Sequence, residues 1–104
     1  MLVFMLGVSS VFAADQARTI KVNGGDCDEC KKHIETIVAG VSGVSSVVWN
    51  KNTKELTVVF DDALTSIDRV QMYLAQSGID TPKYKATEEA YNTLPECCKY
   101  KRDK

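Results

Sequence analysis

The feature that most constrains this chain is a glycine-rich turn, Gly24–Cys30, which joins two runs of different periodicity and carries two cysteines. In the preceding run, residues 18–23, Ile20 and Val22 fall on one face, which predicts a strand. In the following run, residues 31–38, apolar side chains recur at helical spacing, which predicts an amphipathic helix. The chain therefore passes from strand to helix through this turn.

The two thiols stand three residues apart at the exposed start of the predicted helix. Backbone N–H groups and the helix dipole at such an end favour the thiolate over the thiol. Because a thiolate either binds a metal ion or attacks a disulfide, Cys27 and Cys30 are candidate metal ligands or redox residues.

The rest of the chain repeats these patterns in the order β-α-β-β-α-β. The next predicted elements are a strand at 44–49, a hairpin turn at 50–53, a strand at 55–60 and a helix at 67–76. A fourth strand is expected at 81–87, with Pro82 placing it at a sheet edge. This order predicts an α+β, ferredoxin-like βαββαβ sandwich with two helices on a four-stranded antiparallel sheet, followed by a short C-terminal extension.

Length, charge and cysteine spacing narrow the class of protein. The chain has 104 residues, which is one domain, and its formal net charge is −1. No bulk field therefore draws it to nucleic acid or to a membrane surface, and no nucleic-acid partner is expected. The four cysteines form two close pairs, Cys27/Cys30 and Cys97/Cys98, whereas a disulfide-stapled scaffold spreads its cysteines over distant segments. We interpret both pairs as ligand or redox sites.

The first residues differ in composition from the remainder. Met1–Ala14 contains no charged residue, and Val11-Phe12-Ala13 puts small residues at the positions that a signal peptidase requires. We interpret residues 1–13 as a secretory signal peptide, residues 14–87 as the folded domain and residues 88–104 as an extension. The positive residues that usually open a signal are missing, as expected of a truncated one. A buried N-terminal helix is the alternative, and the segment is shorter than the roughly 20 apolar residues that span a bilayer.

The element order, with Gly24-x-x-Cys27-x-x-Cys30 at the first strand-to-helix turn, resembles the heavy-metal-associated domain over about residues 18–87. With an export signal in front, the chain is most similar to the periplasmic mercuric-ion-binding members and next to the copper-chaperone-like ones. The resemblance implies that Cys27 and Cys30 bind a soft cation as a dithiolate and pass it on by ligand exchange. The implied partner is a membrane metal transporter or another Cys-x-x-Cys domain.

Two loop residues depart from the family pattern. Gly25 stands where the family usually has Met, which implies a looser loop, and Asp26 replaces the usual Thr. In zinc- and cadmium-exporting members an Asp at this place resembles a third, oxygen ligand. Two thiolates suit Hg(II) or Cu(I), and an added carboxylate suits Zn(II) or Cd(II). The alternative role for Asp26 is that of a helix N-cap.

The second cysteine pair, Cys97-Cys98, lies in the C-terminal extension. The predicted fourth strand would lead about 23 Å away from the loop. A two-turn helix and an extended segment would return about 10 Å each, so the tail can just reach Cys27 and Cys30. A shared four-cysteine site is therefore one hypothesis for these secondary ligands. A separate thiol site, a vicinal disulfide and a metal- or thiol-bridged dimer are the others.

These patterns predict a non-enzymatic, exported carrier of a soft metal ion, with Hg(II) or Cu(I) ahead of Zn(II) or Cd(II). Thiol–disulfide exchange is the alternative role for Cys27-x-x-Cys30, although a thioredoxin-like motif normally has an aromatic or proline environment and a larger α/β fold. A purely structural interaction domain is the third hypothesis.

Overall fold

A computed structural model describes residues 15–102 of the protein. The predicted signal peptide, residues 1–13, lies outside these residues. Between residues 15 and 102, no helix has the length and the apolar character needed to cross a membrane.

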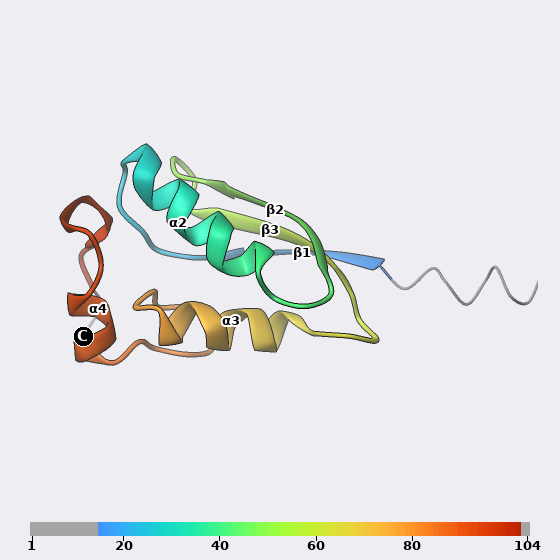
Figure 1. Cartoon of the computed structure of the whole chain (residues 1–104). Coiled ribbons are helices and arrows are strands. Elements are labelled where there is room, and N and C mark those ends of the chain that lie inside the picture. The colour runs from blue at the N-terminus through green and yellow to red at the C-terminus, as the bar shows by residue number, and fades with distance from the viewer. Residues whose placement is uncertain (1–14, 103–104) are drawn as a thin grey trace, which may run out of the picture.

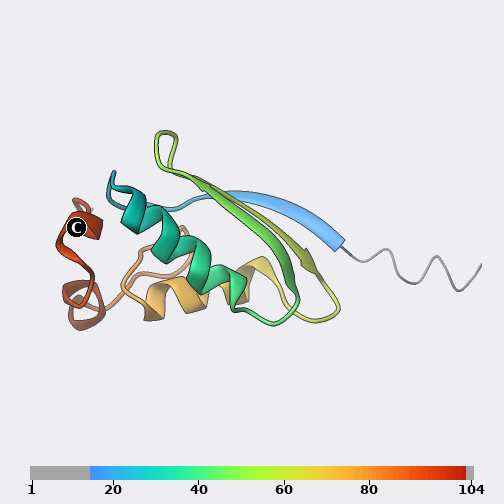
Figure 2. The same cartoon turned by 45° about the horizontal axis from the view of Figure 1, so that its top comes forward.

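Three strands and two main helices form the body of the molecule (Figure 1). Their bounds are β1 Asp15–Lys21, α2 Asp28–Ala39, β2 Val44–Asn50, β3 Glu55–Asp61 and α3 Ile67–Gln76. The short helix α4, Glu88–Asn92, and the 3₁₀ helix η1, Glu96–Cys98, follow in the tail. Both main helices lie on the same face of the sheet (Figure 2).

The sheet has the strand order β1-β3-β2, and both pairings are antiparallel. Residues 15–21 of β1 lie opposite residues 61–55 of β3. On the other side of β3, the register of β2 shifts by one residue between Val44 and Ser46. This bulge leaves Val47 and Trp49 directed toward the core, where Trp49 is completely buried.

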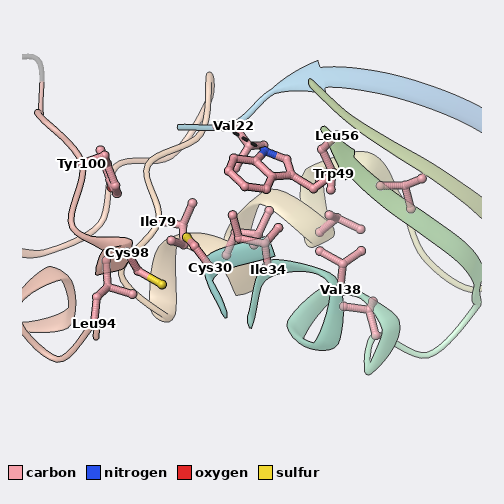
Figure 3. Packing of buried hydrophobic residues seen from close by; sticks show 14 of the residues in the cluster. Val22, Cys30, Ile34, Val38, Trp49, Leu56, Ile79, Leu94, Cys98 and Tyr100 are labelled. Atoms are coloured by element: carbon pink, nitrogen blue, oxygen red, sulfur yellow. Dashed lines mark hydrogen bonds between the residues drawn. The ribbon is translucent and has the colours of Figure 1, made fainter. Parts of the chain in front are cut away.

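The core lies where the apolar face of the sheet meets the apolar stripes of the helices (Figure 3). Fully buried members are Val22, Cys30, Ile34, Val38, Trp49, Leu56, Val58, Val70, Leu74, Ile79 and Cys98. The alternating β3 residues and the helical spacing of α2 predicted this arrangement. Burying one such large aliphatic side chain contributes about 1.5–3 kcal/mol to folding.

Helix α3 has the predicted bounds, and Ser66 caps it by accepting a 3.1 Å hydrogen bond from the Arg69 N–H. Helix α2 begins at Asp28, so Asp28 and Glu29 lie in its first turn, as predicted. Cys30 lies in the same turn, on the apolar stripe of the helix.

The prediction of a fourth strand at 81–87 is wrong, because the described part of the chain forms only three strands. The backbone turns back on itself here: the Thr81 N–H donates to the Tyr84 carbonyl at 2.8 Å. Farther along, the Ala86 N–H donates to the Asp80 carboxylate at 2.7 Å. Local and side-chain acceptors thus take the place of a neighbouring strand, and β1 stays at the edge of the sheet.

Because residues 81–87 turn back, the tail remains at one end of the molecule. Helices α4 and η1 lie at the end where α2 begins (Figures 1 and 2), and η1 contacts α2. Gly78 permits the close packing of α4: its φ is +103°, and a Cβ atom there would lie 2.6 Å from the Ala90 carbonyl oxygen. The tail therefore does not have to return to the Gly24–Cys30 loop from the far end of a fourth strand, the path that the sequence predicts.

Candidate metal centre

Cys27 and Cys30 lie at the N-terminal end of α2 in different surroundings. Cys27 is the N-cap residue, is partly exposed, and accepts a 3.1 Å hydrogen bond from the Cys30 N–H at its carbonyl. Cys30 is completely buried, since the helical period aligns it with Ile34 and Val38 on the apolar stripe. The motif therefore offers one accessible sulfur and one core sulfur.

The tail brings the second cysteine pair to the same place. Cys27 and Cys97 form a disulfide across a sequence separation of 70 residues, with a Cα–Cα distance of 6.0 Å. The next residue, Cys98, is completely buried, and its N–H donates to the Pro95 carbonyl at 2.8 Å within η1. The prediction that the tail can reach the loop is confirmed, but as a disulfide rather than as four free thiols.

The two remaining thiols, Cys30 and Cys98, lie next to each other in the core (Figure 3). The Gly25 N–H donates to Cys30 Sγ at 3.3 Å. Burial raises the pKa of the Cys98 thiol to about 12, and its hydrogen bond to Cys30 acts in the same direction. The sulfurs of Cys27, Cys97 and Cys98 all lie within 4.8 Å of one another. Cys30 is not part of that group, but its side chain lies next to that of Cys98 (Figure 3).

Gly25 gives the tail room to approach the loop. A Cβ atom at this position would lie 1.7 Å from the Cys97 carbonyl oxygen and 2.9 Å from the Cys98 Cα. No side chain fits at such distances. The absence at position 25 of the family's usual Met therefore does not leave a gap in the described structure. The backbone of η1 occupies the space against Gly25.

We expect Gly25→Ala to displace the tail and to lower the free energy of unfolding by about 1–3 kcal/mol, the usual cost of overpacking. The measurement is denaturant unfolding of the oxidised protein, with the Cys27–Cys97 disulfide mapped in the same sample. Gly40→Ala is the matched control, because the nearest atom to its Cβ would be 3.5 Å away. A Gly25→Ala protein with unchanged stability and an intact disulfide would show that the tail does not pack on this glycine.

Asp26 points to Lys54 rather than to the sulfurs. Lys54 Nζ lies 2.7 Å from the Asp26 carboxylate and 2.8 Å from the Gly24 carbonyl, and its ammonium sits 5.3 Å from the centre of the Trp49 ring. This hydrogen bond, helped by the lysine charge, lowers the pKa of Asp26. Asp26 is not the N-cap, since Cys27 holds that position. Its role as a third metal ligand remains a prediction.

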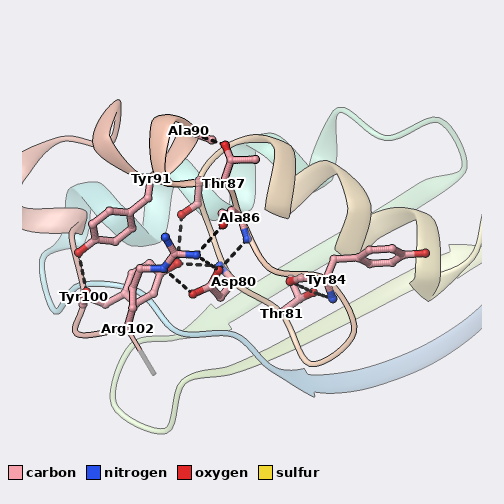
Figure 4. A network of polar contacts seen from close by, with 10 residues as sticks. Asp80, Thr81, Tyr84, Ala86, Thr87, Ala90, Tyr91, Tyr100 and Arg102 are labelled. Carbon is pink, nitrogen blue, oxygen red and sulfur yellow. Dashed lines mark hydrogen bonds and ion pairs between the residues drawn. The ribbon is translucent and has the colours of Figure 1, made fainter. Parts of the chain in front are cut away.

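A polar network fixes the tail to the body (Figure 4). Arg102 donates to both carboxylate oxygens of Asp80, at 2.9 and 2.7 Å, and to the Ala86 carbonyl at 2.6 Å. Tyr100 completes it: its hydroxyl accepts from the Asp80 N–H at 2.7 Å and donates to the Gly78 carbonyl at 3.1 Å. We call Asp80, Tyr100 and Arg102 the tail clamp.

The tail clamp is largely removed from water. Asp80 is 5% exposed, and the Arg102 side chain is 15% exposed. Burial alone would raise the pKa of Asp80, but the Arg102 and Ala86 hydrogen bonds and the Arg102 charge outweigh it, so the pKa lies below its ordinary value of 3.8. The carboxylate is therefore charged and paired, and it holds the chain just after Cys97-Cys98 in place.

An open pocket of about 780 Å³ lies beside the disulfide, between the Gly24–Cys27 turn and residues 96–101. Lys54, Lys99 and Lys101 line it together with the disulfide cysteines. Cys30 and Cys98 do not line it. Solvent and small solutes thus reach the disulfide from this side, while the two free thiols lie behind it.

The sequence pointed to all four cysteines but not to the tail clamp. Asp80 and Arg102 stand 22 residues apart in segments without clear periodicity, and a terminal Lys/Arg-rich stretch usually indicates a solvated tail. The one available signal was the presence of two tyrosines in the extension: Tyr91 packs edge-to-face on Tyr100, with ring centres 5.2 Å apart.

Comparison with known proteins supports the same view of the domain. The chain is 35% identical over 71 residues to the mercuric transport protein periplasmic component of Pseudomonas aeruginosa, covering 68% of this chain and 78% of that protein. It is 27% identical over 63 residues to the copper chaperone CopZ of Staphylococcus epidermidis, covering 61% of this chain and 93% of that protein.

A similar solved structure is that of oxidised MerP from Ralstonia metallidurans CH34. It aligns with a TM-score of 0.62 at 32% identity and covers 65% of this chain and 94% of MerP. The heavy-metal-associated domain pattern matches residues 19–78, which include Cys27 and Cys30 and end before the tail. The chain therefore belongs to the heavy-metal-associated domain family.

Proposed function

We propose that this protein is an exported, periplasmic carrier of a thiophilic metal ion, which it captures with Cys27 and Cys30 and passes on by ligand exchange. The observation that carries the proposal is the meeting of two cysteine pairs at the start of α2, in a domain related to a periplasmic mercuric transport component and a copper chaperone. Once Cys27 is a free thiol, capture replaces two thiol protons by the ion and makes or breaks no other bond. The role is that of a carrier rather than an enzyme.

Capture by Cys27 requires the disulfide to be open, because a disulfide sulfur is not a thiolate ligand. A dithiol donor can open it: the donor gives two electrons and two protons and becomes a disulfide, while Cys27 and Cys97 become thiols. The open pocket beside the disulfide provides access for such a donor. The Cys97 and Cys98 sulfurs lie within 4.8 Å of the Cys27 sulfur in the oxidised structure, which supports them as secondary ligands once the disulfide is open.

The ligand chemistry favours Hg(II) or Cu(I) as the cargo. Among residues 15–102, the soft donors at the site are the cysteine sulfurs. Hg(II) and Cu(I) accept two thiolates in a near-linear arrangement, whereas Zn(II) and Cd(II) call for further ligands. Asp26 could add an oxygen ligand for these harder ions only after leaving Lys54. The recipient is a membrane transporter or another Cys-x-x-Cys domain, whose thiolates replace those of Cys27 and Cys30 one at a time.

We expect Cys27→Ser/Cys30→Ser to abolish stoichiometric binding of one Hg(II) or Cu(I) per chain under reducing conditions. Hydroxyl groups are hard donors and do not replace thiolates for soft ions. Isothermal titration with a competing chelator measures both stoichiometry and affinity. Cys97→Ser/Cys98→Ser is the matched control and should keep one bound ion. Unchanged binding by the Cys27→Ser/Cys30→Ser protein would refute the carrier role of this motif.

The Cys27–Cys97 disulfide favours a second candidate, a thiol–disulfide exchange module. Its accessible bond lies beside two buried thiols, which is the composition of an exchange site. The two functions separate in one assay. A redox module in its reduced form reduces a model disulfide at a rate that depends on Cys27 and binds no soft ion tightly. A carrier in its reduced form binds the soft ion tightly and does not reduce the model disulfide.

A further inference from the structure

We propose that a second, closed metal site exists in the oxidised protein: Cys30 and Cys98 hold one Hg(II) ion between them while the Cys27–Cys97 disulfide stays intact. This inference rests on the proposed function in one respect, namely that the cargo is a soft ion. The Cys30/Cys98 site differs from the Cys27/Cys30 site in its ligands and in the redox state of the protein. In the oxidised protein, each cysteine pair contributes one sulfur to the ion and one to the disulfide.

The disulfide itself selects these two ligands. It joins one member of the loop pair to one member of the tail pair, so the free thiols that remain are Cys30 from α2 and Cys98 from η1. The two side chains are adjacent in the core, with the Cys98 sulfur directed toward Cys30 and with Ile79 and Leu94 nearby (Figure 3). Two thiols from opposing backbones are the arrangement that a two-coordinate ion requires.

The charge balance at the buried Cys30/Cys98 pair favours a divalent ion. Both thiols are completely inaccessible to water, and burying an uncompensated charge is costly. Hg(II) with two thiolates is neutral overall, whereas Cu(I) with two thiolates carries a net negative charge. Zn(II) would leave two of its four coordination positions unfilled in this apolar site. The Gly25 N–H, 3.3 Å from Cys30 Sγ, can compensate part of the charge on one sulfur.

Binding is a simple exchange of protons for metal. Two S–H bonds break, two Hg–S bonds form and two protons leave, with no change in oxidation state. The soft ion displaces the thiol protons because it forms the stronger bond to sulfur. The disulfide and the backbone of η1 then lie over the ion on the side of the open pocket.

The tail clamp makes the site independent of the disulfide. Asp80, Tyr100 and Arg102 hold the chain just after Cys98 through buried hydrogen bonds that involve none of the cysteines. Removing the disulfide should therefore leave Cys98 beside Cys30. This separation allows each part of the site to be tested alone.

The test is titration of the oxidised full chain with mercuric chloride in the absence of reductant. Before the ion is added, a thiol count in denaturant should give two free thiols per chain. We expect native mass spectrometry to show one Hg(II) per chain, both thiols to become unreactive, and peptide mapping to find Cys27 still linked to Cys97.

Three variants make the assignment specific. Cys98→Ser and Cys98→Ala, each with the disulfide verified and circular dichroism unchanged, should lose the bound ion. Cys27→Ser/Cys97→Ser should retain it, because it keeps the Cys30/Cys98 pair. The inference is overturned if the oxidised protein binds no Hg(II), if it has no free thiols before titration, or if binding moves the disulfide to another pair. If the oxidised protein fails but the reduced protein binds through Cys27 and Cys30, only this inference falls; if the reduced protein also fails, the carrier function falls.

Discussion

The Cys27→Ser/Cys97→Ser protein is expected to lose about 3–4 kcal/mol of unfolding free energy relative to the oxidised wild type. The disulfide spans a separation of 70 residues and so closes most of the described chain into one loop. Chain entropy predicts a stabilisation that grows with loop length, and this loop is long for a domain of this size. Urea unfolding at equilibrium, followed by circular dichroism, measures the difference.

The reduced proteins provide the control for this prediction. With a reductant present throughout, wild type and Cys27→Ser/Cys97→Ser should unfold at nearly the same urea concentration, because neither then has a cross-link. If the two proteins also unfold together under oxidising conditions, the disulfide does not stabilise the fold.

The second large effect is expected at the tail clamp: Arg102→Met should destabilise the protein by about 3–5 kcal/mol, the usual cost of leaving a buried charge without its partner. Asp80 is 5% exposed and takes two of its hydrogen bonds from Arg102. The double variant Asp80→Asn/Arg102→Met removes the charge as well as its partner and should recover part of the loss. Lys101→Met, at the exposed neighbouring position, is the matched control and should change stability by less than about 0.5 kcal/mol.

The same pair gives stability a defined dependence on pH. Because the pKa of Asp80 is lower in the folded state than its ordinary value of 3.8, its contribution is fully present above that value and is lost as pH falls through the folded-state pKa. Comparing the urea midpoints of wild type and Arg102→Met between neutral and acid pH measures this. The gap between the two proteins should narrow on acidification, and a gap that stays constant or widens would argue against a charged Asp80–Arg102 pair.

The regular body of the fold followed from local patterns. The period-2 alternation of Leu56, Val58 and Phe60 and the helical spacing of Cys30, Ile34 and Val38 identified the buried faces, and the Gly24-Gly25 turn placed the cysteines at the start of α2. Such patterns are readable because each element buries one face against the others, so apolar residues recur along the sequence with the period of the element.

The tail could not be derived in this way. Residues 79–102 contain short helices and turns whose hydrogen bonds run to distant side chains, such as Arg102 to Asp80, and no periodicity encodes those partners. Pro82 and the Thr81–Tyr84 turn replaced the predicted fourth strand, which changed where the tail begins. The position of Cys97 against Gly25 likewise depends on the absence of one side chain, a signal whose meaning requires the three-dimensional structure.

The two departures from the family loop thus have different structural correlates. Gly25 makes room for the backbone of the tail, and Asp26 forms an ion pair with Lys54 on the exposed side of the loop. With the tail in place, the site contains two free thiols and one disulfide instead of an open dithiol. The redox state of Cys27 and Cys97 therefore decides which sulfurs are available to a metal ion.

The measurement that tests the central claim most directly is a count of bound ions by native mass spectrometry on the reduced protein, with Hg(II) added in the presence of excess Zn(II). We expect one Hg(II) per chain in the wild type, retained against Zn(II), and no such stoichiometric binding in Cys27→Ser/Cys30→Ser. A reduced wild-type protein that binds no Hg(II), or a Cys27→Ser/Cys30→Ser protein that binds it equally well, would contradict the carrier function.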